Sequence, residues 1–485
     1  MANQSQESVP ERQSSFSSSS ASVVVVVVPF PAQSHLNQLL QLSHIISSRK
    51  IPVHYVGSTL HISQVKSRAN QALNGTKTLI QFHDFPIPHF PSPLPYDTKF
   101  VSHLMPSFEA SVKYLREPFA NLLTLLSKTA TRVVIIHDPL MTSVVQDSST
   151  LPNTESYRFH CASSFYYFAS LRDTLGIQIR HDGDNDPKNI PSCEKSLTPE
   201  FGAFIGYQVQ FMKKMKTSGH LYNACRLIES DFLDFILEKA RESDEDVKLW
   251  AIGPLETVTS FKNRWGNRVD SQGQHKCLEW LDKQERNSVL YISFGTTTFM
   301  KDEQIRELAI GLEKSGVKFL WVLRDADKGN VFDEGEVRRP QLPQGFEERV
   351  KEKGIVVRDW APQLEILGHS STGGFMSHCG WNSCVESISL GVPIAAWPMH
   401  SDQPMNAVFI TNVLKVGVLV REWAKKDELV SSSVIEKVVK RLMKSEEGDE
   451  MRKMAEELGN ELRKATDEGG VSRMELDSFI AHITR

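Results

Sequence analysis

The chain has 485 residues, of which 40% are hydrophobic and 24% are charged. This length allows two or three domains, and this composition is typical of globular proteins, so it excludes wholesale disorder, a collagen repeat and a simple coiled coil. The 55 Lys and Arg residues against 59 Asp and Glu residues give a formal net charge of −4, so no global field attracts the chain to nucleic acid or to an anionic membrane.

The first 22 residues contain many Ser and Gln residues together with Glu7 and Glu11, and they lack the apolar segment of a secretory signal. We interpret residues 1–22 as a disordered tail; the alternative, a plastid transit peptide, should be rich in Arg and poor in acidic residues. The six cysteines are scattered along the chain, which favours a reducing compartment, so we expect a cytoplasmic protein. The longest apolar run, residues 23–28, is too short to cross a bilayer, so no membrane partner is expected.

Short apolar runs alternate with amphipathic stretches along the chain. This pattern is typical of parallel strands that are buried on both faces and connected by helices. In the first half we predict strands at residues 23–28, 51–56 and 132–136, with a helix between the first two. In the second half we predict strands at residues 289–294, 317–323, 355–357, 374–377, 392–397 and 416–420, with a helix at residues 302–316. The predicted fold class is α/β, with two doubly wound parallel sheets.

The division into domains follows from one irregular segment. Residues 253–275 contain Gly, Pro, Ser, Asn and charged residues without a sustained period, and we predict a linker there. The linker would separate an N-terminal domain of residues 23–252 from a C-terminal domain of residues 276–465. Residues 466–485 are expected to form a helix that packs back on the N-terminal domain.

The turn after the first strand, residues 29–35, contains no glycine, although a dinucleotide-binding turn places a G-x-G-x-x-G pattern there. NAD binding of the usual Rossmann type is therefore disfavoured. Ligands of such sheets collect at the carboxyl ends of the strands, where His35 is expected to lie, and Asp138 follows the strand at residues 132–136 at the same edge. An imidazole held by a carboxylate can take a proton from a hydroxyl, so His35 and Asp138 predict a catalytic pair; a capping Asp and a surface His are the alternative.

Two groups of side chains follow strands of the second half and are suited to a nucleotide. They are Trp360, Ala361 and Gln363 after residues 355–357, and His378, Asn382, Ser383 and Glu386 after residues 374–377. Backbone N–H groups at the start of a helix bind a diphosphate, and Glu386 can accept hydrogen bonds from ribose hydroxyls. Asp402 and Gln403 follow the next strand and are suited to sugar hydroxyls, although a polar loop explains them equally.

The block from residue 360 to residue 403, which begins WAPQ and ends HSDQ, resembles the donor-binding box of plant family 1 UDP-glycosyltransferases. The resemblance implies a GT-B fold, in which two Rossmann-like domains face each other across a cleft. It also implies an inverting transfer that uses neither a metal nor another cofactor. Position by position, the resemblance implies contacts to uracil from Trp360 and Ala361, to ribose from Gln363 and Glu386, to the diphosphate from His378, Asn382 and Ser383, and to the sugar from Trp381, Asp402 and Gln403.

The first half of the chain carries the resemblance further, through segments such as PFPAQSHLNQ, IPVHYVG and REPFANLL. These segments are similar to the zeatin O-glucosyltransferase and zeatin O-xylosyltransferase branch of the family, which modifies the side-chain hydroxyl of a cytokinin. The resemblance implies that His35 is the catalytic base, that Asp138 is its partner and that Ser293 and Thr296 belong to a second phosphate-side turn.

The same resemblance implies the two substrates. Gln403 implies UDP-glucose as the donor, with UDP-xylose as the alternative. The implied acceptor is a small hydroxylated molecule of the zeatin type, with a phenolic or terpenoid compound as the alternative. The sequence departs from the family pattern at two places in the first half: Ser34 stands where much of the family has Gly, and residues 137–139 differ from the branch. If that Gly position requires a positive φ, Ser34 would be strained.

Residues 83–106 are rich in Pro and aromatic residues, and we expect a long ordered loop over the ligand edge of the first sheet. Its candidates for acceptor contacts are His83, Phe90 and His103. Two rival functions remain at this point. One is a hormone-binding GT-B protein that performs no transfer, which the intact His35 and Asp138 disfavour. The other is a Rossmann oxidoreductase, which the missing glycine pattern disfavours.

Overall fold

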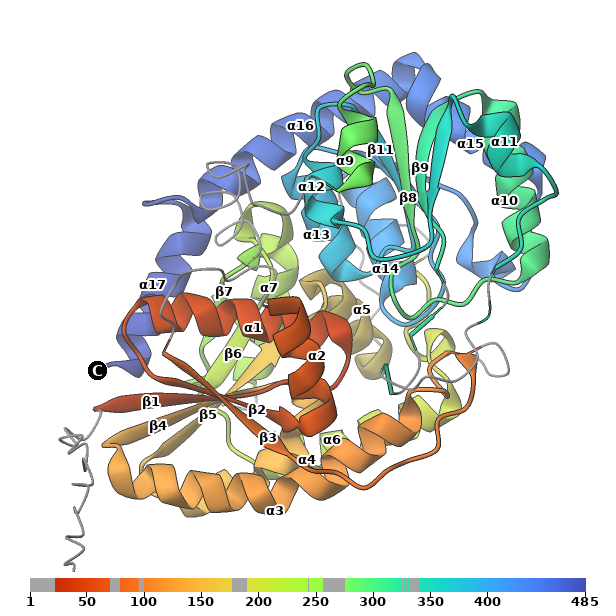
Figure 1. Ribbon diagram of the computed structural model, residues 1–485. Coiled ribbons are helices and arrows are strands. Elements are labelled where there is room, and N and C mark those ends of the chain that lie inside the picture. The colour runs from red at the N-terminus through yellow and green to blue at the C-terminus, as the bar shows by residue number, and fades with distance from the viewer. Residues whose placement is uncertain are drawn as a thin grey trace, which may run out of the picture.

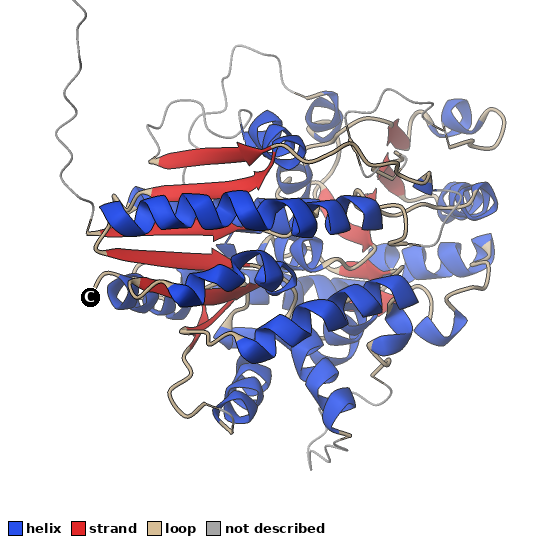
Figure 2. Ribbon diagram, turned by 90° about the horizontal axis from the view of Figure 1, so that it is seen from below, coloured by secondary structure: helices blue, strands red, loops and turns tan. Residues whose placement is uncertain are grey.

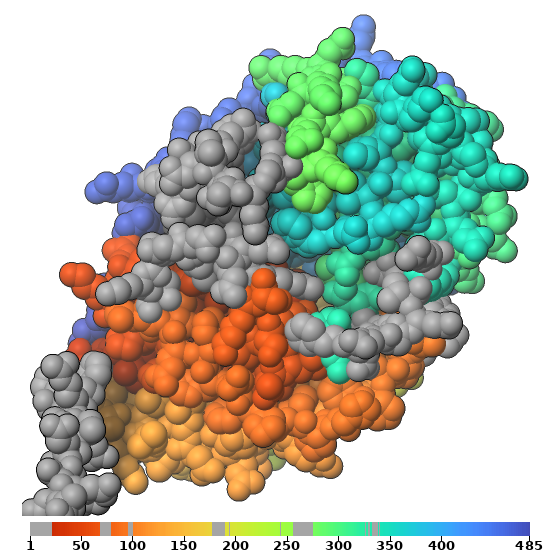
Figure 3. All heavy atoms as spheres, in the orientation of Figure 1, coloured from red at the N-terminus to blue at the C-terminus, as the bar shows by residue number. Residues whose placement is uncertain are grey.

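The protein is described by a computed structural model that covers residues 22–69, 79–95, 100–176, 190–242, 244–255, 275–324, 326–327, 330–331, 338 and 340–485. Apart from Ser22, the predicted tail lies outside these residues, as do residues 256–274 of the predicted linker. The described chain forms two lobes, each built on one parallel sheet (Figure 1). The surface view shows the red-to-orange N-terminal lobe beside the green-to-teal C-terminal lobe (Figure 3).

Within the described residues, the N-terminal sheet has seven parallel strands in the order β3-β2-β1-β4-β5-β6-β7. The strands are β1 Val23–Val28, β2 Val53–Ser58, β3 Ile80–Phe85, β4 Arg132–His137, β5 Thr154–His160, β6 Gly219–Tyr222 and β7 Leu249–Ala251. Alternate Val residues of β1 face opposite sides, because successive strand side chains point to opposite faces of a sheet. Val23, Val25 and Val27 therefore pack in one core, and Val24, Val26 and Val28 pack in another.

Helices cover both faces of this sheet (Figure 2). One core joins β1 to α1 (Gln33–Ser48) and α2 (Thr59–Ala69), and the other joins it to α3 (Met105–Thr129). The other helical segments of the lobe are α4 Thr142–Val145, α5 Ser164–Leu175, α6 Pro199–Lys214, α7 Arg226–Arg241, and the short η2 Pro139–Met141, η3 Gln146–Thr150 and η4 Glu194–Ser196.

The C-terminal sheet has six parallel strands among the described residues, in the order β10-β9-β8-β11-β12-β13. They are β8 Val289–Ser293, β9 Lys318–Val322, β10 Gly354–Val357, β11 Thr372–Ser377, β12 Ile394–Ala396 and β13 Gly417–Leu419. The helical segments of this lobe are α9 Lys276–Leu281, α10 Asp302–Ser315, α11 Phe346–Val350, α12 Gln363–Leu367, α13 Trp381–Ser389, α14 Gln403–Val408, η5 Phe409–Val413, η6 Trp423–Lys425, α15 Ser432–Lys444 and α16 Glu446–Thr466.

The last helix, α17 (Val471–Ile483), returns to the N-terminal lobe (Figure 1). Its buried residues Leu476, Phe479 and Ile483 share a core with β1 and α1. The ring of Phe479 meets that of Tyr157 at a centroid distance of 5.4 Å. The C-terminal end of the chain therefore packs with the beginning of the fold.

All nine predicted strands are present, with ends within two residues of the predicted ones. The predicted helix at residues 302–316 corresponds to α10, and Gly316 follows it with a φ of 60°, as expected for a residue that ends a helix. The two parallel α/β sheets confirm the predicted fold class.

The prediction of a loop from residue 83 was wrong at its start, because His83 lies in β3. This edge strand, IQFHDF, has a partly exposed pattern rather than a continuous apolar run, so hydrophobicity alone did not reveal it. The irregular segment begins only after Phe85, and α3 begins at Met105. Among the described residues, no helix has both the length and the apolar character needed to cross a membrane.

Candidate active site

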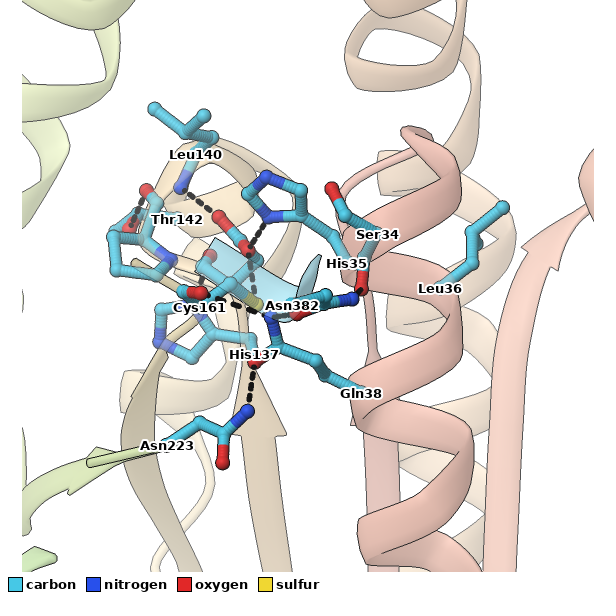
Figure 4. Close-up of polar contacts among 12 residues, drawn as sticks. Ser34, His35, Leu36, Gln38, His137, Leu140, Thr142, Cys161, Asn223 and Asn382 are labelled. Atoms are coloured by element: carbon cyan, nitrogen blue, oxygen red, sulfur yellow. Dashed lines mark hydrogen bonds and ion pairs between the residues drawn. The ribbon is translucent and has the colours of Figure 1, made fainter. Parts of the chain in front are cut away.

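His35 and Asp138 meet at the carboxyl edge of the N-terminal sheet. β1 and β4 are neighbours, with Val28 opposite His137, so the segments that follow both strands emerge at the same level. His35 is in the first turn of α1, and its Nδ1 lies 2.6 Å from Asp138 Oδ2 (Figure 4). The imidazole is one-quarter exposed, and its Nε2 is on the side of the ring away from the carboxylate. This arrangement leaves Nε2 to accept a proton from a hydroxyl.

The Asp138 carboxylate is fixed by further donors. Its Oδ1 accepts a hydrogen bond of 2.9 Å from the backbone N–H of Leu140, and its Oδ2 also accepts from the thiol of Cys161 at 3.5 Å. Asp138 is 1% exposed, so these donors and His35 replace the water that a surface carboxylate would have. The carboxylate can therefore hold the orientation of the imidazole.

An aromatic cluster adjoins the imidazole. The rings of Phe30 and His35 meet edge to face at a centroid distance of 5.2 Å, and Phe30 packs on Phe108 at a centroid distance of 4.4 Å. Phe201 and Phe204, both in α6, complete the cluster. These four residues were not predicted; Phe30 in the turn before α1 was the one signal that the sequence offered.

On the other lobe, three predicted ribose and phosphate contacts form one network. Gln363 Nε2 donates to Glu386 Oε2 at 2.6 Å and to Ser383 Oγ at 3.0 Å. The hydroxyl of Tyr291 donates to Gln363 Oε1 at 3.2 Å, which fixes the orientation of the amide. Gln363 begins α12, and Ser383 and Glu386 lie on α13, so the network joins the ends of two neighbouring elements of the donor box.

The predicted base contacts follow β10 and the second phosphate-side turn follows β8, with β9 between these two strands in the sheet. Trp360 is 55% exposed, so its ring face is accessible, whereas Ala361 is buried. Ser293 is the last residue of β8, and Phe294 and Gly295, the latter with a φ of 76°, separate it from Thr296. A side chain at Gly295 would lie 2.6 Å from His378 Nε2, so this turn approaches His378 closely.

His378 lies buried between this turn and the start of α13. A Cβ atom at Gly380 would lie 2.7 Å from His378 Nε2, which shows how closely the imidazole fits there. Burial lowers the pKa of His378 to about 4, while the backbone of Ser293 raises it in part. The imidazole is therefore neutral at pH 7, and it can serve as a hydrogen-bond donor rather than as a cation.

Asp402 and Gln403 both form hydrogen bonds within the C-terminal lobe, and Asp402 Oδ2 accepts from Asn406 Nδ2 at 2.7 Å. Gln403 Oε1 accepts from the backbone N–H groups of Met399 and His400 at 2.9 and 3.0 Å, so its amide nitrogen points the other way, toward the His400 imidazole. Burial raises the pKa of Asp402, and the nearby His35 lowers it in part.

Trp381 and Asn382 both contact the N-terminal lobe. The indole N–H of Trp381 donates to the backbone carbonyl of Asn223 at 2.8 Å, and Trp381 is 3% exposed. The amide of Asn382 donates to Ser34 O at 3.3 Å and accepts a hydrogen bond from Gln38. Both predicted donor contacts thus also bond to the N-terminal lobe, Trp381 through its indole N–H and Asn382 through its amide.

Ser34 lies in the first turn of α1 and is not among the residues with a positive φ. The strain considered for a Ser at this position therefore does not arise. Cys379 and Ser401, at the ends of two strands of the other lobe, adopt positive φ values of 64° and 57° instead.

The three predicted acceptor residues do not gather at one place. His83 Nε2 lies 2.8 Å from His54 Nδ1, between β2 and β3 and short of their carboxyl ends. Phe90 is half-buried in the irregular segment before α3. His103 is buried, and its neighbour Phe100 stacks on His400 of the other lobe. Of the three, His103 is the one placed beside the donor-side loop.

Comparison with known proteins gives the family. Residues 21–257 match the family described as "Glycosyltransferase, N-terminal domain", and residues 254–450 match "UDP-glucoronosyl and UDP-glucosyl transferase". Zeatin O-glucosyltransferase of Phaseolus lunatus is 52% identical over 460 residues, which cover 94% of this chain and 96% of the relative. This chain belongs to the UDP-glycosyltransferase family. Zeatin O-xylosyltransferase of Phaseolus vulgaris is 51% identical, over 94% of this chain and 97% of that protein.

Solved structures agree with this assignment. The crystal structure of a UGT transferase from Siraitia grosvenorii in complex with UDP has a TM-score of 0.74 and 29% identity, and the match covers 96% of this chain and 100% of that chain. The crystal structure of TcCGT1 in complex with UDP has the same TM-score and 26% identity, over 96% of this chain and 99% of that chain. The UDP-glycosyltransferase described here therefore has the GT-B fold.

One group of side chains in the described part of this UDP-glycosyltransferase has the composition of a metal site. The ligand atoms of His35, Asp138 and Cys161 lie within 4.8 Å of one another. Their present geometry is that of a hydrogen-bonded chain, because His35 Nδ1 and Asp138 Oδ2 are 2.6 Å apart. A metal bound through both atoms would have to replace this hydrogen bond.

The neutral state of His378 generates a prediction about pH. With a pKa of about 4, its protonated fraction is negligible above about pH 6, and it contributes no change of charge up to about pH 8. The dissociation constant of UDP-glucose should therefore change by less than about twofold between these pH values, measured by calorimetry. Binding that strengthens steadily as the pH falls, and that loses this trend in His378→Gln, would show that His378 binds the donor as a cation.

Proposed function

We propose that this enzyme transfers glucose from UDP-glucose to the side-chain hydroxyl of a zeatin-type cytokinin, with inversion at the anomeric carbon and without a metal. The observation that carries the proposal is the 2.6 Å contact between His35 Nδ1 and Asp138 Oδ2, at the edge of the lobe that faces the donor box. The names of the relatives that are 52% and 51% identical support the cytokinin acceptor.

The proposed reaction is a direct displacement. His35 Nε2 takes the proton of the acceptor hydroxyl while the hydroxyl oxygen forms a bond to the anomeric carbon. The bond from that carbon to the UDP oxygen breaks, and UDP leaves with the electron pair. Asp138 stabilises the imidazolium that forms, and a positioned base of this kind contributes about 10²- to 10⁴-fold to the rate.

The C-terminal lobe would hold the donor. We assign uracil to Trp360 and Ala361, ribose to Gln363 and Glu386, and the sugar to Asp402 and Gln403. The diphosphate would lie near His378, Ser383, Ser293 and Thr296, at the start of α13. Free backbone N–H groups and the positive end of the helix dipole at this point would stabilise the charge that develops on UDP.

The N-terminal lobe would hold the acceptor. We propose that residues 23–252, together with α17, form the acceptor domain and that residues 276–465 form the donor domain. The cluster of Phe30, Phe108, Phe201 and Phe204 adjoins His35 through Phe30. Phe30, Phe108 and Phe204 are buried and Phe201 is half-buried, so the exposed part of Phe201 would offer the apolar surface that suits a flat ring system. The ring system of a cytokinin meets this requirement, and a phenolic acceptor is the alternative.

We also propose that the enzyme works in a reducing compartment, the cytoplasm. All six cysteines are free and buried. A reducing compartment is consistent with cysteines of this kind, which serve as small packing residues.

A direct assay decides both substrates. The enzyme is incubated with UDP-glucose or UDP-xylose and with trans-zeatin, cis-zeatin, dihydrozeatin or a simple phenol, and products are identified by mass spectrometry. We expect a zeatin O-glucoside, formed in proportion to released UDP, and unchanged turnover after removal of metal by a chelator. Exclusive use of UDP-xylose would refute the donor assignment, and zeatin binding without UDP release would favour the non-enzymatic hormone-binding alternative. Oxidation of NADH or NADPH instead would favour an oxidoreductase.

The roles of His35 and Asp138 are tested by His35→Ala and Asp138→Asn. His35→Ala should lower kcat by about 10²- to 10⁴-fold, because the acceptor proton loses its base, while UDP binding measured by calorimetry stays close to that of the unchanged enzyme. Asp138→Asn should lower kcat as well, since the neutral amide does not stabilise the imidazolium. As a matched control, His54→Ala removes a histidine away from the edge and should leave kcat near its original value. Near-normal turnover of His35→Ala would reject the assignment.

A further inference from the structure

A buried amide connects the helix that carries His35 to the helix at the start of the donor box. Gln38 is 1% exposed and lies three residues after His35 on α1, so the two side chains leave neighbouring positions of the same helix. His35 is directed to Asp138, whereas Gln38 reaches across to the other lobe (Figure 4).

Every hydrogen-bonding group of the Gln38 amide has a partner. Its Nε2 donates to the backbone carbonyl of Cys161 at 2.9 Å and to Oδ1 of Asn382, and its Oε1 accepts from Asn223 Nδ2 at 3.0 Å. Because both N–H bonds and the carbonyl are used, the amide can adopt only one orientation.

The three partners belong to three different parts of the site. Cys161 follows β5 and holds Asp138 through its thiol. Asn223 follows β6, and its side-chain oxygen accepts a hydrogen bond of 3.1 Å from the N–H of Leu255. Its backbone carbonyl accepts a hydrogen bond from the indole N–H of Trp381. Asn382 is in the first turn of α13, next to Trp381. The amide of Gln38 on α1 thus connects the residues that follow β5 and β6 in the N-terminal lobe with α13 of the C-terminal lobe.

We propose that Gln38 is a positioning residue, which sets the distance between His35 and the donor held at the start of α13. This inference rests on the proposed function, since the distance matters only if sugar passes from α13 to an acceptor deprotonated by His35. A displacement of about 1 Å between reacting groups can reduce a rate by about 10²-fold, even when the changed residue is remote from the chemistry. Gln38 would act through Asn382 and α1, without touching either substrate.

The kinetic test uses Gln38→Met, which keeps a similar volume but removes all three hydrogen bonds. We expect kcat to fall by about 10- to 100-fold while the dissociation constant of UDP changes by less than about threefold, because the donor box is intact but misplaced. Ser43→Ala is the matched control, since Ser43 is buried in the same helix and its hydroxyl bonds to Leu39 O of α1. This control should keep its kcat. A normal kcat in Gln38→Met, or a loss of UDP affinity equal to the loss of kcat, would overturn the proposal.

A second measurement does not depend on turnover. Spin labels at Leu125→Cys and Leu429→Cys, positions that are 60% and 55% exposed and lie one on each lobe, report the distance between the lobes in the presence of UDP. We expect one narrow distance distribution in the unchanged enzyme and in Ser43→Ala, and a broader or shifted one in Gln38→Met. If Gln38→Met does not fold, Asn382→Ala breaks the same contact from its partly exposed side and should broaden the distribution in the same way.

The two measurements separate the two proposals. If the unchanged enzyme transfers no sugar to any acceptor, the proposed function fails, and the distance measurement still decides whether Gln38 sets the relation of the lobes. If transfer is normal and the distributions of Gln38→Met and the unchanged enzyme coincide, the proposed function stands and the role of Gln38 is refuted.

Discussion

The hydrogen bond between His35 and Asp138 depends on two neighbouring parallel strands that end at the same level. β1 and β4 run side by side with Val28 opposite His137, so the turn before α1 and the turn that begins with Asp138 face each other. A carboxylate removed from water costs several kcal/mol unless donors replace the water, and here the donors are the imidazole, the N–H of Leu140 and the thiol of Cys161. The strand register therefore brings the carboxylate of Asp138 and the imidazole of His35 together, and their hydrogen bond then holds both side chains in place.

The second requirement is a fixed relation between the lobes. Besides the contacts of Gln38, the Ser163 hydroxyl donates to Asn406 at 2.7 Å, and the N–H of Ser401 donates to Ser196 O at 3.2 Å. A buried polar group left without its partner costs about 1–3 kcal/mol, so a sliding of one lobe over the other would break several of these contacts at once. Because hydrogen bonds are directional, these contacts specify one orientation of the two lobes relative to each other. A purely apolar contact between the lobes would specify this orientation less sharply.

How deeply a strand is buried decides how clearly its sequence predicts it. β1 and β8 were predictable because a strand buried on both faces has a continuous apolar run. β3 and β5 escaped because they alternate with polar and charged residues, so His83 was wrongly placed in a loop. The donor box was found as a pattern of residues, but the engagement of Trp381 and Asn382 by the other lobe depends on partners more than 150 positions away. Gln38 offered one signal, a polar residue on the apolar side of a helix, and that signal does not identify its partners.

We propose that a nucleotide sugar held by the C-terminal lobe presents its anomeric carbon to an acceptor oxygen held at His35. A crystal structure of the enzyme with UDP and trans-zeatin tests this most directly. We expect the uracil ring on Trp360, the diphosphate at the start of α13, and the side-chain oxygen of zeatin within hydrogen-bond distance of His35 Nε2. A nucleotide bound away from α13, or an acceptor oxygen on the far side of the Phe30 cluster from His35, would contradict the account.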